Sequence, residues 1–373
     1  MYGTLGSVTN AGKFMLVVHI GAGNHLRSRD SEYKKILQNA LRSKSYNAAA
    51  IALEEPSLTN TGCGSSLNMD GKVECDASII RANMNENKIE VRIAAHNIQH
   101  KTPTLALLGG LNALTREYSA RYGFWGLSAP VVFDYGAIAL RFGLEIHSQN
   151  ELVEGLKRKV FGLYRERIER RDIKVDDSVQ DSVQENVQEI QDIQNSVQDS
   201  VQVPEFPEVQ DTVGVIHLTQ ETLTVLSSSG GNFFKLPGRV GCAGIVGAAT
   251  AVRFIGLWCI SCLCSGNGDD IVQMNLAATI ADRFEDPDTF GFLLVSYIKE
   301  AAISLPLQAQ DSHGNNIIYV GVLCVLRNIS TGETRLVYSH STESFYFGYM
   351  KDKPHTVLSR SRAGVFVQGE YRI

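Results

Sequence analysis

The sequence predicts a layered α/β domain, with strands at the centre and helices on the outside. Apolar, strand-like runs occur in both halves of the chain, and helix-like stretches flank them in each half. Of the 373 residues, 44% are hydrophobic and 20% are charged, which is close to the average for globular proteins. This composition excludes global disorder. We expect one composite domain in three parts, residues 1–175, 176–211 and 212–373.

The charge balance and the cysteines limit the partners and the compartment. With 35 basic and 40 acidic side chains, the formal net charge is −5, so the chain lacks the basic excess typical of nucleic-acid binding. Seven cysteines, an odd number at uneven spacing, favour reduced thiols over a disulfide framework. The apolar stretch 240–264 contains Arg253 and four glycines, which argues against a membrane span. We therefore expect a cytoplasmic or nuclear protein, not a secreted one, with neither nucleic acid nor membrane as partner.

The first part of the chain reads as a buried strand followed by helices and further strands. Residues 14–20 are apolar and end in a glycine turn, and residues 31–53 carry apolar side chains at helical spacing: Tyr33, Ile36, Leu37, Ala40 and Leu41. Residues 58–68 are rich in Gly, Asn and Ser and predict a shaped loop. Further strands are expected over 73–80 and 89–95, and further helices over 104–116 and 151–171.

Residues 176–211 form a segment of different composition. An approximate Asp-Ser-Val-Gln repeat runs to residue 202 without a basic side chain, and its apolar positions recur every ~3.7 residues, close to the helical period. The β-branched apolar positions and the many Asp, Ser and Asn are weak helix formers. A mobile acidic linker and a folded helix therefore both remain open. Pro204 and Pro207 then favour an extended exit.

The third part repeats the pattern of central strands and flanking helices. Residues 213–218 and 223–228 alternate like a hairpin. The apolar stretch that follows is expected to form a helix over 242–254 and a strand over 257–264. The remaining helices are expected over 273–284 and 290–305, and the remaining strands over 317–326, 334–340 and 345–349.

A threonine at the junction of the second and third parts is the candidate nucleophile. A Thr hydroxyl needs a neighbouring base, and the residue's own α-amine can serve once the preceding peptide bond is cut. A free α-amine has a pKa near ~7.7–8.0 and is suited to proton transfer at neutral pH. Cleavage between Asp211 and Thr212, at the end of the linker segment, would free this amine.

An ordered set of motifs surrounds this threonine. They are His19-Ile20-Gly21-Ala22-Gly23, the Asn60 loop, Glu74-Cys75-Asp76-Ala77-Ser78, Ser229-Gly230-Gly231, Leu236-Pro237-Gly238-Arg239-Val240-Gly241, Ser265-Gly266-Asn267-Gly268-Asp269 and His340-Ser341-Thr342-Glu343-Ser344. The set resembles the threonine-dependent branch of the N-terminal-nucleophile hydrolases, which contains plant-type asparaginases, glycosylasparaginases and taspases (threonine aspartases). Within that branch it is most similar to the taspase group.

This resemblance implies a fold and an activity. The fold would be an αββα sandwich, made as a proenzyme and cut autocatalytically between Asp211 and Thr212 into an α/β heterodimer. Whether two heterodimers pair further is left open. The activity would be that of a threonine endopeptidase that cleaves protein substrates after Asp, without a cofactor or a metal.

The resemblance also implies roles for individual residues. Thr212 would attack the carbonyl carbon, and Ser229 would orient its amine. Ser265 and Gly266 match the loop that supplies oxyanion donors, which typically stabilise a transition state by ~2.7–4 kcal/mol each, and Asn60 faces the nucleophile in relatives.

Substrate binding is assigned in the same way. Arg239 would hold the aspartate side chain of the substrate through a two-pronged contact that Lys cannot reproduce. Gly21 and Gly23 would let the backbone approach the nucleophile strand closely.

One position separates the two substrate classes of this branch. Asparaginases usually carry Asp directly after the Gly-Arg-Val-Gly motif, where it binds the substrate ammonium, and here that residue is Cys242. A neutral thiol leaves a buried ammonium without a counter-charge, which is costly. This favours a peptide substrate. The alternative is an isoaspartyl peptidase or L-asparaginase acting on small aspartyl compounds, and a third class is a non-catalytic scaffold, against which Thr212, Ser229 and Arg239 argue.

Three other groups of residues admit a second interpretation. Cys242, Cys259, Cys262 and Cys264 invite a metal site, but thiols that alternate along a strand point to opposite faces, so buried small side chains are expected. His96 and His100 have helical spacing in a polar, Pro-containing stretch, and we expect surface imidazoles. The basic run 157–171 fits either a solvated helix face or a nuclear-import segment, the latter by the resemblance to taspases.

Overall fold

The computed structural model describes residues 14–153, 155–174, 212–311 and 313–373. Contacts divide the chain into two units. The described parts of the first unit are residues 14–152, 212–311 and 313–373, and helix α6 (Gly155–Lys174) belongs to the second. The described parts of the first unit contain every predicted site residue except Asp211. That residue and the predicted linker 176–211, together with the question of whether it is helical, lie outside the described residues.

The first sheet has eight strands, in the order β12-β11-β1-β5-β6-β2-β3-β4. All neighbouring strands are antiparallel except β3 and β4. Strands from both predicted halves alternate in the middle of this sheet. Their bounds are β1 (Met15–Gly23), β2 (Cys75–Asn83), β3 (Lys88–Ile98), β4 (Val132–Asp134), β5 (Val213–Leu218), β6 (Thr222–Ser229), β11 (Ser344–Met350) and β12 (Pro354–Arg360).

The second sheet has five antiparallel strands, in the order β13-β10-β9-β8-β7. Their bounds are β7 (Thr250–Ile255), β8 (Trp258–Gly266), β9 (Val320–Asn328), β10 (Thr334–His340) and β13 (Val367–Arg372). All five follow Thr212 in the sequence, so this sheet is built from the third part of the chain alone.

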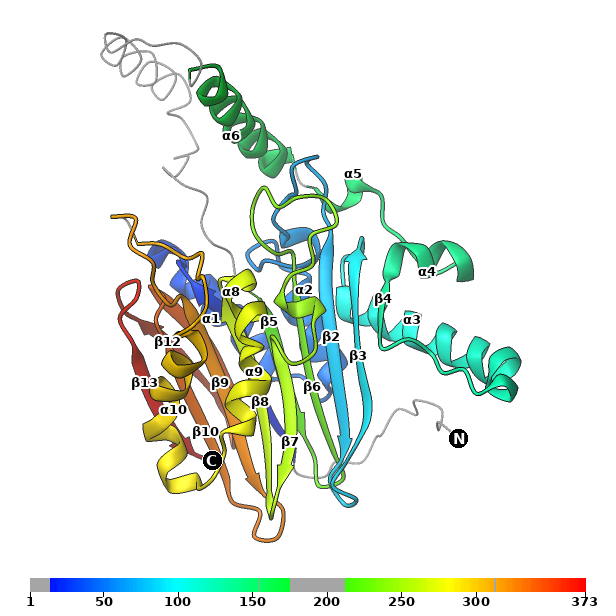
Figure 1. Ribbon diagram of the computed structural model, residues 1–373, viewed down its shortest axis with the longest axis vertical. Helices are drawn as coiled ribbons and strands as arrows, with labels where there is room; N and C mark the ends of the chain where they lie inside the picture. The colour runs from blue at the N-terminus through cyan, green and yellow to red at the C-terminus, as the bar shows by residue number, and fades with distance from the viewer. Residues whose placement is uncertain (1–13, 154, 175–211, 312) are drawn as a thin grey trace. The chain divides into compact units, whose positions relative to one another are not determined.

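Helices cover the outer face of each sheet (Figure 1). On the first sheet lie α1 (Asp30–Leu41), α2 (Tyr46–Glu54) and α3 (Pro103–Glu117), and on the second lie α8 (Gly268–Met274), α9 (Leu276–Asp282) and α10 (Pro287–Ala302). Two more helices, α4 (Tyr135–Phe142) and α5 (Gln149–Leu152), follow β4. The order helix, sheet, sheet, helix confirms the layered αββα fold expected from the sequence.

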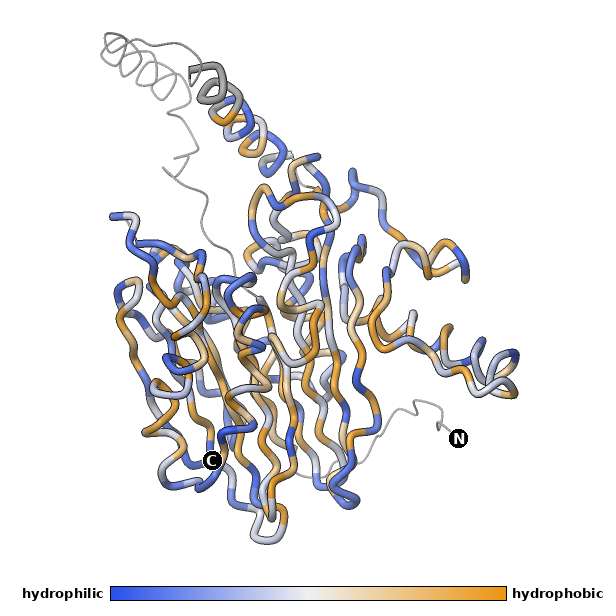
Figure 2. The backbone as a smooth tube through the Cα atoms, viewed as in Figure 1, coloured by the Kyte–Doolittle hydropathy of each residue, from blue (hydrophilic) through white to orange (hydrophobic). Residues whose placement is uncertain are grey.

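Alternation along the strands produces two apolar cores, and hydrophobic residues concentrate on the strands accordingly (Figure 2). Along β9, Leu323 and Val325 face the first sheet, where they pack with residues such as Ile216. Val322 and Leu326 face α9 and α10 instead. Strands with a period of two therefore bury both of their faces, one between the sheets and one under helices.

Several predicted elements of the first part differ in detail. The helix expected over 31–53 is two helices, because the chain breaks at residues 42–45 and Ser45 caps α2 by accepting from the Ala48 N–H. The buried face of α1 matches the predicted apolar positions. The helix expected over 151–171 is divided between α5 and α6. Strand β4 and helix α4 had no prediction.

The helix expected over 242–254 is wrong. A single 3₁₀ turn, Cys242–Gly244, is followed by a loop and then by strand β7. Gly247 lies at φ +102°, a conformation that ends helical structure, and β7 pairs with β8 along its full length. The stretch 240–264 is therefore a loop and a buried hairpin. Its local pattern of Ala and Gly is compatible with either state, and the long-range pairing decides it.

Two further differences lie nearer the C-terminus. The helix expected over 273–284 divides into α8 and α9 at Asn275, which has left-handed backbone at φ +46°. Strands β12 and β13 were not predicted, because they lie at sheet edges and are only half buried, so their apolar alternation is weak. Among the described residues, no helix is long and apolar enough to cross a membrane.

Candidate active site

The predicted nucleophile lies directly before a central strand of the first sheet. Thr212 precedes β5 and is 3% exposed. Val213 pairs with Ser228 across β5 and β6, so Thr212 and Ser229 lie opposite each other at the next step of the same antiparallel register. The structure thus brings together the two hydroxyls that the resemblance assigned to one site.

The loop that contains Asn60 packs against the end of β6. The Asn60 side-chain amide donates to the Gly231 carbonyl (2.9 Å), and the Gly230 N–H donates to the Asn60 carbonyl (2.7 Å). The Ser229 hydroxyl accepts from the Gly231 N–H (3.0 Å). A Cβ on Gly230 would lie 1.9 Å from the Ser65 hydroxyl, so only glycine fits there. Asn60 and Ser229 are therefore held in one local network.

Arg239 lies in a cradle of three glycines. A Cβ on Gly231, Gly241 or Gly268 would approach its guanidinium nitrogens to within 2.7–2.9 Å. The Arg239 Nε donates to the Asp269 carboxylate (3.1 Å), and Nη2 lies 2.8 Å from the same oxygen. Its Nη1 is buried and has no hydrogen-bond partner among the described residues. A buried guanidinium with an unused donor is suited to bind an anionic or carbonyl group of a substrate.

A buried carboxylate next to Ser229 was not among the predicted site residues. Asp76 pairs with Ser229 across β2 and β6 and accepts from the Gly241 N–H (2.7 Å). Burial raises the pKa of Asp76 to about 6, opposed by the nearby charges of Lys235 and Arg239. Its signal in the sequence was an acidic residue at the start of an otherwise apolar strand, within a motif that the resemblance had already singled out. Asp76 holds the loop that carries Arg239.

The end of β8 approaches the glycine turn of β1. The Ser265 hydroxyl is fully buried and accepts from the Ala22 N–H (3.0 Å). Gly266 has φ +124°, and a Cβ there would lie 2.3 Å from the Tyr319 carbonyl oxygen. Both residues are therefore fixed at the end of the second sheet, next to β1.

The two glycines of β1 occupy different places. Gly21, at φ +106°, sits at an irregularity of β1 two residues beyond His19, which pairs with Gly214 of β5. Gly21 thus lies at the end of the sheet where Thr212 begins. Gly23 pairs with Ser344 instead and accepts from its hydroxyl (3.0 Å). The structure ties Gly23 to β11, on the side of β1 away from β5.

Cys242 contacts Thr212, the predicted nucleophile. Its Sγ lies 3.8 Å from the Thr212 Oγ1, and the side chain is buried. Burial raises the pKa of Cys242 to about 11, so the thiol is neutral at pH 7. The other cysteines of the predicted cluster lie among apolar side chains, and the Sγ atoms of Cys262 and Cys324 are 3.4 Å apart across β8 and β9.

The arrangement can support attack by a hydroxyl on a carbonyl group. Thr212 contacts Cys242 and lies opposite Ser229 in the strand register. Asp76 and Arg239 both lie against Gly241, the residue before Cys242. The group of described residues with the spacing of metal ligands, His100, Glu145 and His147, lies elsewhere. The arrangement is therefore suited to nucleophilic acyl transfer, in which a side-chain hydroxyl of the protein attacks the carbonyl group of the substrate.

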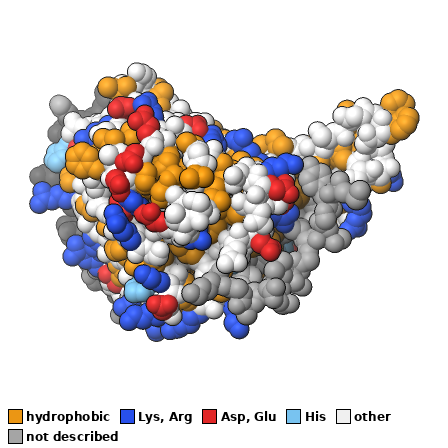
Figure 3. Space-filling view, turned by 90° about the horizontal axis from the view of Figure 1, so that it is seen from below, with side chains coloured by type: hydrophobic (Ala, Val, Ile, Leu, Met, Phe, Trp, Pro, Cys, Tyr) orange, Lys and Arg blue, Asp and Glu red, His pale blue; other side chains and the backbone are white. Residues whose placement is uncertain are grey.

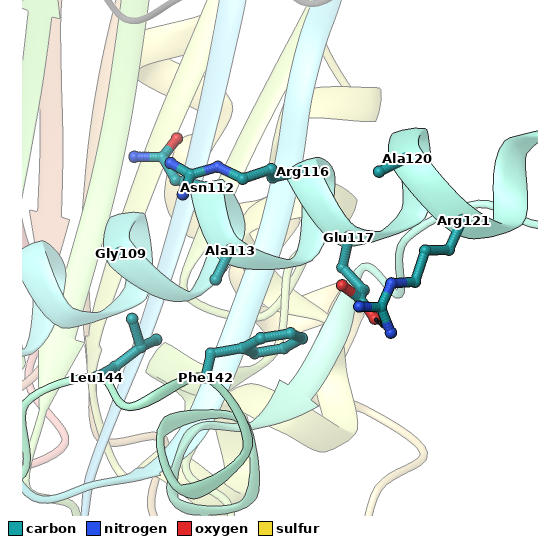
Figure 4. A pocket seen from close by; sticks show the side chains of 9 residues that line it. All are labelled: Gly109, Asn112, Ala113, Arg116, Glu117, Ala120, Arg121, Phe142 and Leu144. Carbon is teal, nitrogen blue, oxygen red and sulfur yellow. Dashed lines mark ion pairs between the residues drawn. The ribbon is translucent and has the colours of Figure 1, made fainter.

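A separate pocket lies between α3 and α4 and contains none of the predicted site residues (Figure 4). Its volume is about 370 Å³. Glu117 and Arg121 on its rim form an ion pair of 3.4 Å.

Beyond α3, Phe124 and Trp125 are strongly exposed, and Figure 3 shows hydrophobic side chains at the end of a projecting lobe.

Comparisons with known proteins find similarity to asparaginases. A family model described as asparaginase matches residues 158–291, a range that includes Thr212, Ser229, Arg239 and Ser265. The plant-type L-asparaginases of Thermococcus kodakarensis and Pyrococcus furiosus are 23% and 25% identical, each over 66% of this chain and 74% of their own length. That of Pyrococcus horikoshii is 24% identical over 82% of this chain and 81% of its own. The chain is therefore similar to plant-type L-asparaginases over 66–82% of its length, and to the asparaginase family model over part of it.

Proposed function

We propose that the chain is a threonine-dependent hydrolase that becomes active when the bond between Asp211 and Thr212 is cut, and that it hydrolyses an amide bond at an aspartyl group. The observation that carries this proposal is the position of Thr212. It lies buried before β5, opposite Ser229 and against Cys242, which directly follows Gly241 of the cradle that holds Arg239.

The proposed reaction has two steps. The Thr212 hydroxyl attacks the substrate carbonyl while its own α-amine takes the hydroxyl proton. The proton passes to the departing amine or ammonia, which leaves an ester on Thr212. Water then hydrolyses that ester and restores the hydroxyl. Because a free α-amine has a pKa near ~7.7–8.0, we expect activity to rise as the pH increases through this range.

Small aspartyl amides are the substrate class that the comparisons favour. The three relatives described above are named plant-type L-asparaginases. One contact in the site agrees with them. Asp269 lies beside Arg239, so the pair presents a carboxylate and a guanidinium together, the two charges needed to bind the ammonium and carboxylate of a free amino acid.

Peptide bonds after Asp are the second substrate class, and Cys242 favours them. The thiol next to Thr212 is neutral, so it offers no counter-charge to a substrate ammonium at this position. A peptide presents a neutral amide there instead. Under this alternative the chain is a threonine endopeptidase of the taspase type, and Arg239 binds the aspartate side chain alone.

One experiment tests the proposed maturation. On a denaturing gel, purified wild-type protein should separate into residues 1–211 and 212–373, and the sequence of the smaller fragment should start at Thr212. Thr212→Ala removes the hydroxyl and should remain a single band. Thr219→Ala, in the turn after β5, is the matched control and should be cut like the wild type. Cleavage of Thr212→Ala at the same bond would contradict the nucleophile assignment.

A second experiment separates the substrate classes. Cut protein is incubated with L-asparagine, with a β-aspartyl dipeptide and with a peptide that contains an internal Asp. Release of ammonia or of a free amino acid supports the first class, and a new amino terminus directly after Asp supports the second. Inactivity of fully cut protein on all three substrates would contradict the proposed hydrolase.

A further inference from the structure

Two histidines and a glutamate converge at the end of β3, outside the proposed active site. The ligand atoms of His100, Glu145 and His147 all lie within 4.8 Å of one another. The His100 Nε2 is 3.1 Å from Glu145 Oε2, and the His147 Nε2 is 3.7 Å from Glu145 Oε1. We propose that these three side chains bind one zinc ion, with the fourth position open to water.

The spacing agrees with tetrahedral coordination. With zinc–ligand bonds of about 2.0–2.1 Å, neighbouring ligand atoms in a tetrahedron lie about 3.3 Å apart. The distance from the His100 Nε2 to Glu145 Oε2, 3.1 Å, is close to this value, and the three ligand atoms, one from each residue, lie within 4.8 Å of one another. Two imidazoles and one carboxylate are also a ligand set that zinc takes in proteins when it keeps a water molecule. Rotation of the exposed Glu145 side chain can bring the three ligand atoms closer together around the ion.

The backbone already holds the two loops together. The His147 N–H donates to the Gln99 carbonyl (2.9 Å), which is one residue from His100. The Tyr135 hydroxyl donates to the Glu145 carbonyl (2.8 Å). The two imidazole rings meet edge to face, with centroids 4.5 Å apart. The ligands are thus placed by contacts that do not require the metal, as a preformed site needs.

Surrounding groups orient the imidazoles and leave room for the metal. The His100 Nδ1 accepts from the Thr102 N–H (3.0 Å) and also lies 3.2 Å from the Thr102 carbonyl, and these contacts fix the ring with its Nε2 turned toward Glu145. The His147 Nδ1 is buried and has no hydrogen-bond partner among the described residues. Both side chains are about nine-tenths buried, whereas Glu145 is 71% exposed, so solvent reaches the site from the carboxylate side. Lys101 and Glu151 supply one charge of each sign nearby.

This site corrects the expectation of surface imidazoles at His96 and His100. His96 lies on β3 and is half-buried, with its Nδ1 3.8 Å from the Asp134 carboxylate. His100 lies beyond the end of the strand and is buried against His147, which is distant in sequence. The helical spacing of His96 and His100 therefore does not correspond to a helix, because His96 lies on a strand. The imidazole that lies next to His100 is that of His147, from another loop.

Binding of zinc would hold the chain in place close to Leu152, where it leaves the first unit. Glu145 and His147 lie just before α5, whose Gln149 bonds to both backbone groups of Val73 (2.8 and 3.2 Å). A metal that joins this loop to the end of β3 closes the loop of more than forty residues between His100 and Glu145, and it should stabilise that segment. The inference does not depend on the proposed hydrolase activity.

Calorimetric titration of the chelator-treated, dialysed full-length chain with Zn²⁺ tests the inference. We expect one ion per chain and a rise in the thermal unfolding temperature. Removal of a residue that only supports a metal ligand typically lowers the affinity for the metal about 10- to 100-fold. His147→Ala removes a ligand itself, so its affinity for Zn²⁺ should fall at least ~100-fold. Glu145→Gln changes an exposed side chain, should keep the fold, and should bind at least ~10-fold more weakly.

His96→Ala is the matched control, since it removes a histidine near the same strand end that is not one of the three proposed ligands. It should bind Zn²⁺ like the wild type. A second readout is the visible absorption of Co²⁺ in a four-coordinate site, expected in the wild type and in His96→Ala but not in His147→Ala. The inference is overturned if the folded wild-type chain shows no saturable Zn²⁺ binding in the micromolar range. Equal affinities for the wild type, Glu145→Gln and His147→Ala would overturn it as well.

Discussion

At the scale of single residues, the candidate site depends on charged groups held where water is scarce. Arg239 is held by three glycines on one side and by Asp269 on the other, and Asp76 is buried beside it. Burying such groups is costly unless each has a partner. Because apolar side chains would fill this space at less cost, we infer that these charged side chains bind or orient a polar substrate.

Arg239→Lys tests the role of the guanidinium. A lysine keeps the positive charge but loses the planar set of donors that fits a carboxylate. A hydrogen bond to a charged group contributes ~1.5–3 kcal/mol, so we expect kcat/KM to fall about 10- to 100-fold on whichever substrate class is active. Arg253→Lys, in a surface ion pair with Asp282, is the control and should leave kcat/KM unchanged. Unchanged kinetics in Arg239→Lys would contradict substrate binding by Arg239.

A second buried carboxylate lies on the helix side of the same strands. Glu54 at the end of α2 accepts from the Ser228 hydroxyl (2.6 Å) and from the Thr104 N–H (3.2 Å), and Ser228 neighbours Ser229. Burial raises the pKa of Glu54 to about 7, although these hydrogen bonds oppose the shift. The native state therefore holds a proton on Glu54 in a pH range where the unfolded chain, with a pKa near 4.5, has lost it.

Glu54→Gln should change how stability depends on pH. The stabilisation linked to the raised pKa is fully present below pH 4.5 and is lost as the pH rises through about 7. A neutral glutamine lacks this contribution, which amounts to at most about 3 kcal/mol. Buried histidines such as His19, whose pKa burial lowers to about 3, have the opposite pH dependence. Urea midpoints of both proteins at pH 5 and pH 8 isolate the Glu54 contribution, and parallel midpoints would contradict it.

At the scale of elements, glycines decide how closely the layers approach. Helix α3 carries two in succession with opposite surroundings. Nothing lies within 4 Å of a Cβ added to Gly109, which lines the pocket of Figure 4. A Cβ on Gly110 would meet the ring of Phe133 at 2.9 Å. One glycine is therefore needed for helix–sheet packing, and the other is not.

The pair allows a matched test of this packing. Gly109→Ala should stabilise the protein by about 0.5–1 kcal/mol, because alanine favours a helix and restricts the unfolded chain. Gly110→Ala gains the same propensity but must displace the buried Phe133 ring, which typically costs about 1–3 kcal/mol. Thermal unfolding temperatures should thus move in opposite directions. A rise in both would mean that β4 and α3 adjust without strain.

At the scale of the whole molecule, the first sheet joins the two sides of the predicted cleavage bond. Strand β1, from the first part of the chain, lies between β11 and β5 of the third part, and β2 pairs with β6. A cut before Thr212 leaves all of these ladders unbroken. Separating the two fragments would expose the strand edges and the core between the two sheets, so association should survive maturation.

The cut protein should therefore behave as one particle. Size-exclusion chromatography and native mass spectrometry should show both fragments in a single species, which separates only in denaturant. Uncut Thr212→Ala protein is the reference, and its elution volume should be the same as that of the cut form. Elution of the two fragments as separate species under native conditions would contradict the interleaved sheet. Doubling of the mass would indicate that two heterodimers pair.

Sequence alone determined the features that depend on neighbouring residues. The hairpin of β5 and β6 lies within seventeen residues, so its alternation places Thr212 opposite Ser229. Local patterns of the same kind predicted the apolar face of α1 and the strands β1, β2 and β5, which begin within two residues of the predicted positions. The motifs also pointed to an N-terminal-nucleophile hydrolase fold, and the two helix-covered sheets confirm it.

Tertiary structure alone decided the features that depend on distant segments. Asp76 lies beside Ser229, Glu54 reaches Ser228 and His100 meets His147 only because separate strands and loops converge. The Ala- and Gly-rich stretch 242–254 has no clear periodicity, and the pairing of β7 with β8 determined that it forms a loop and a strand instead of a helix. Periodicity shows which residues of an element face a core, but strand pairing and burial arise between segments far apart in the chain, and these set the partners and charges of the candidate site.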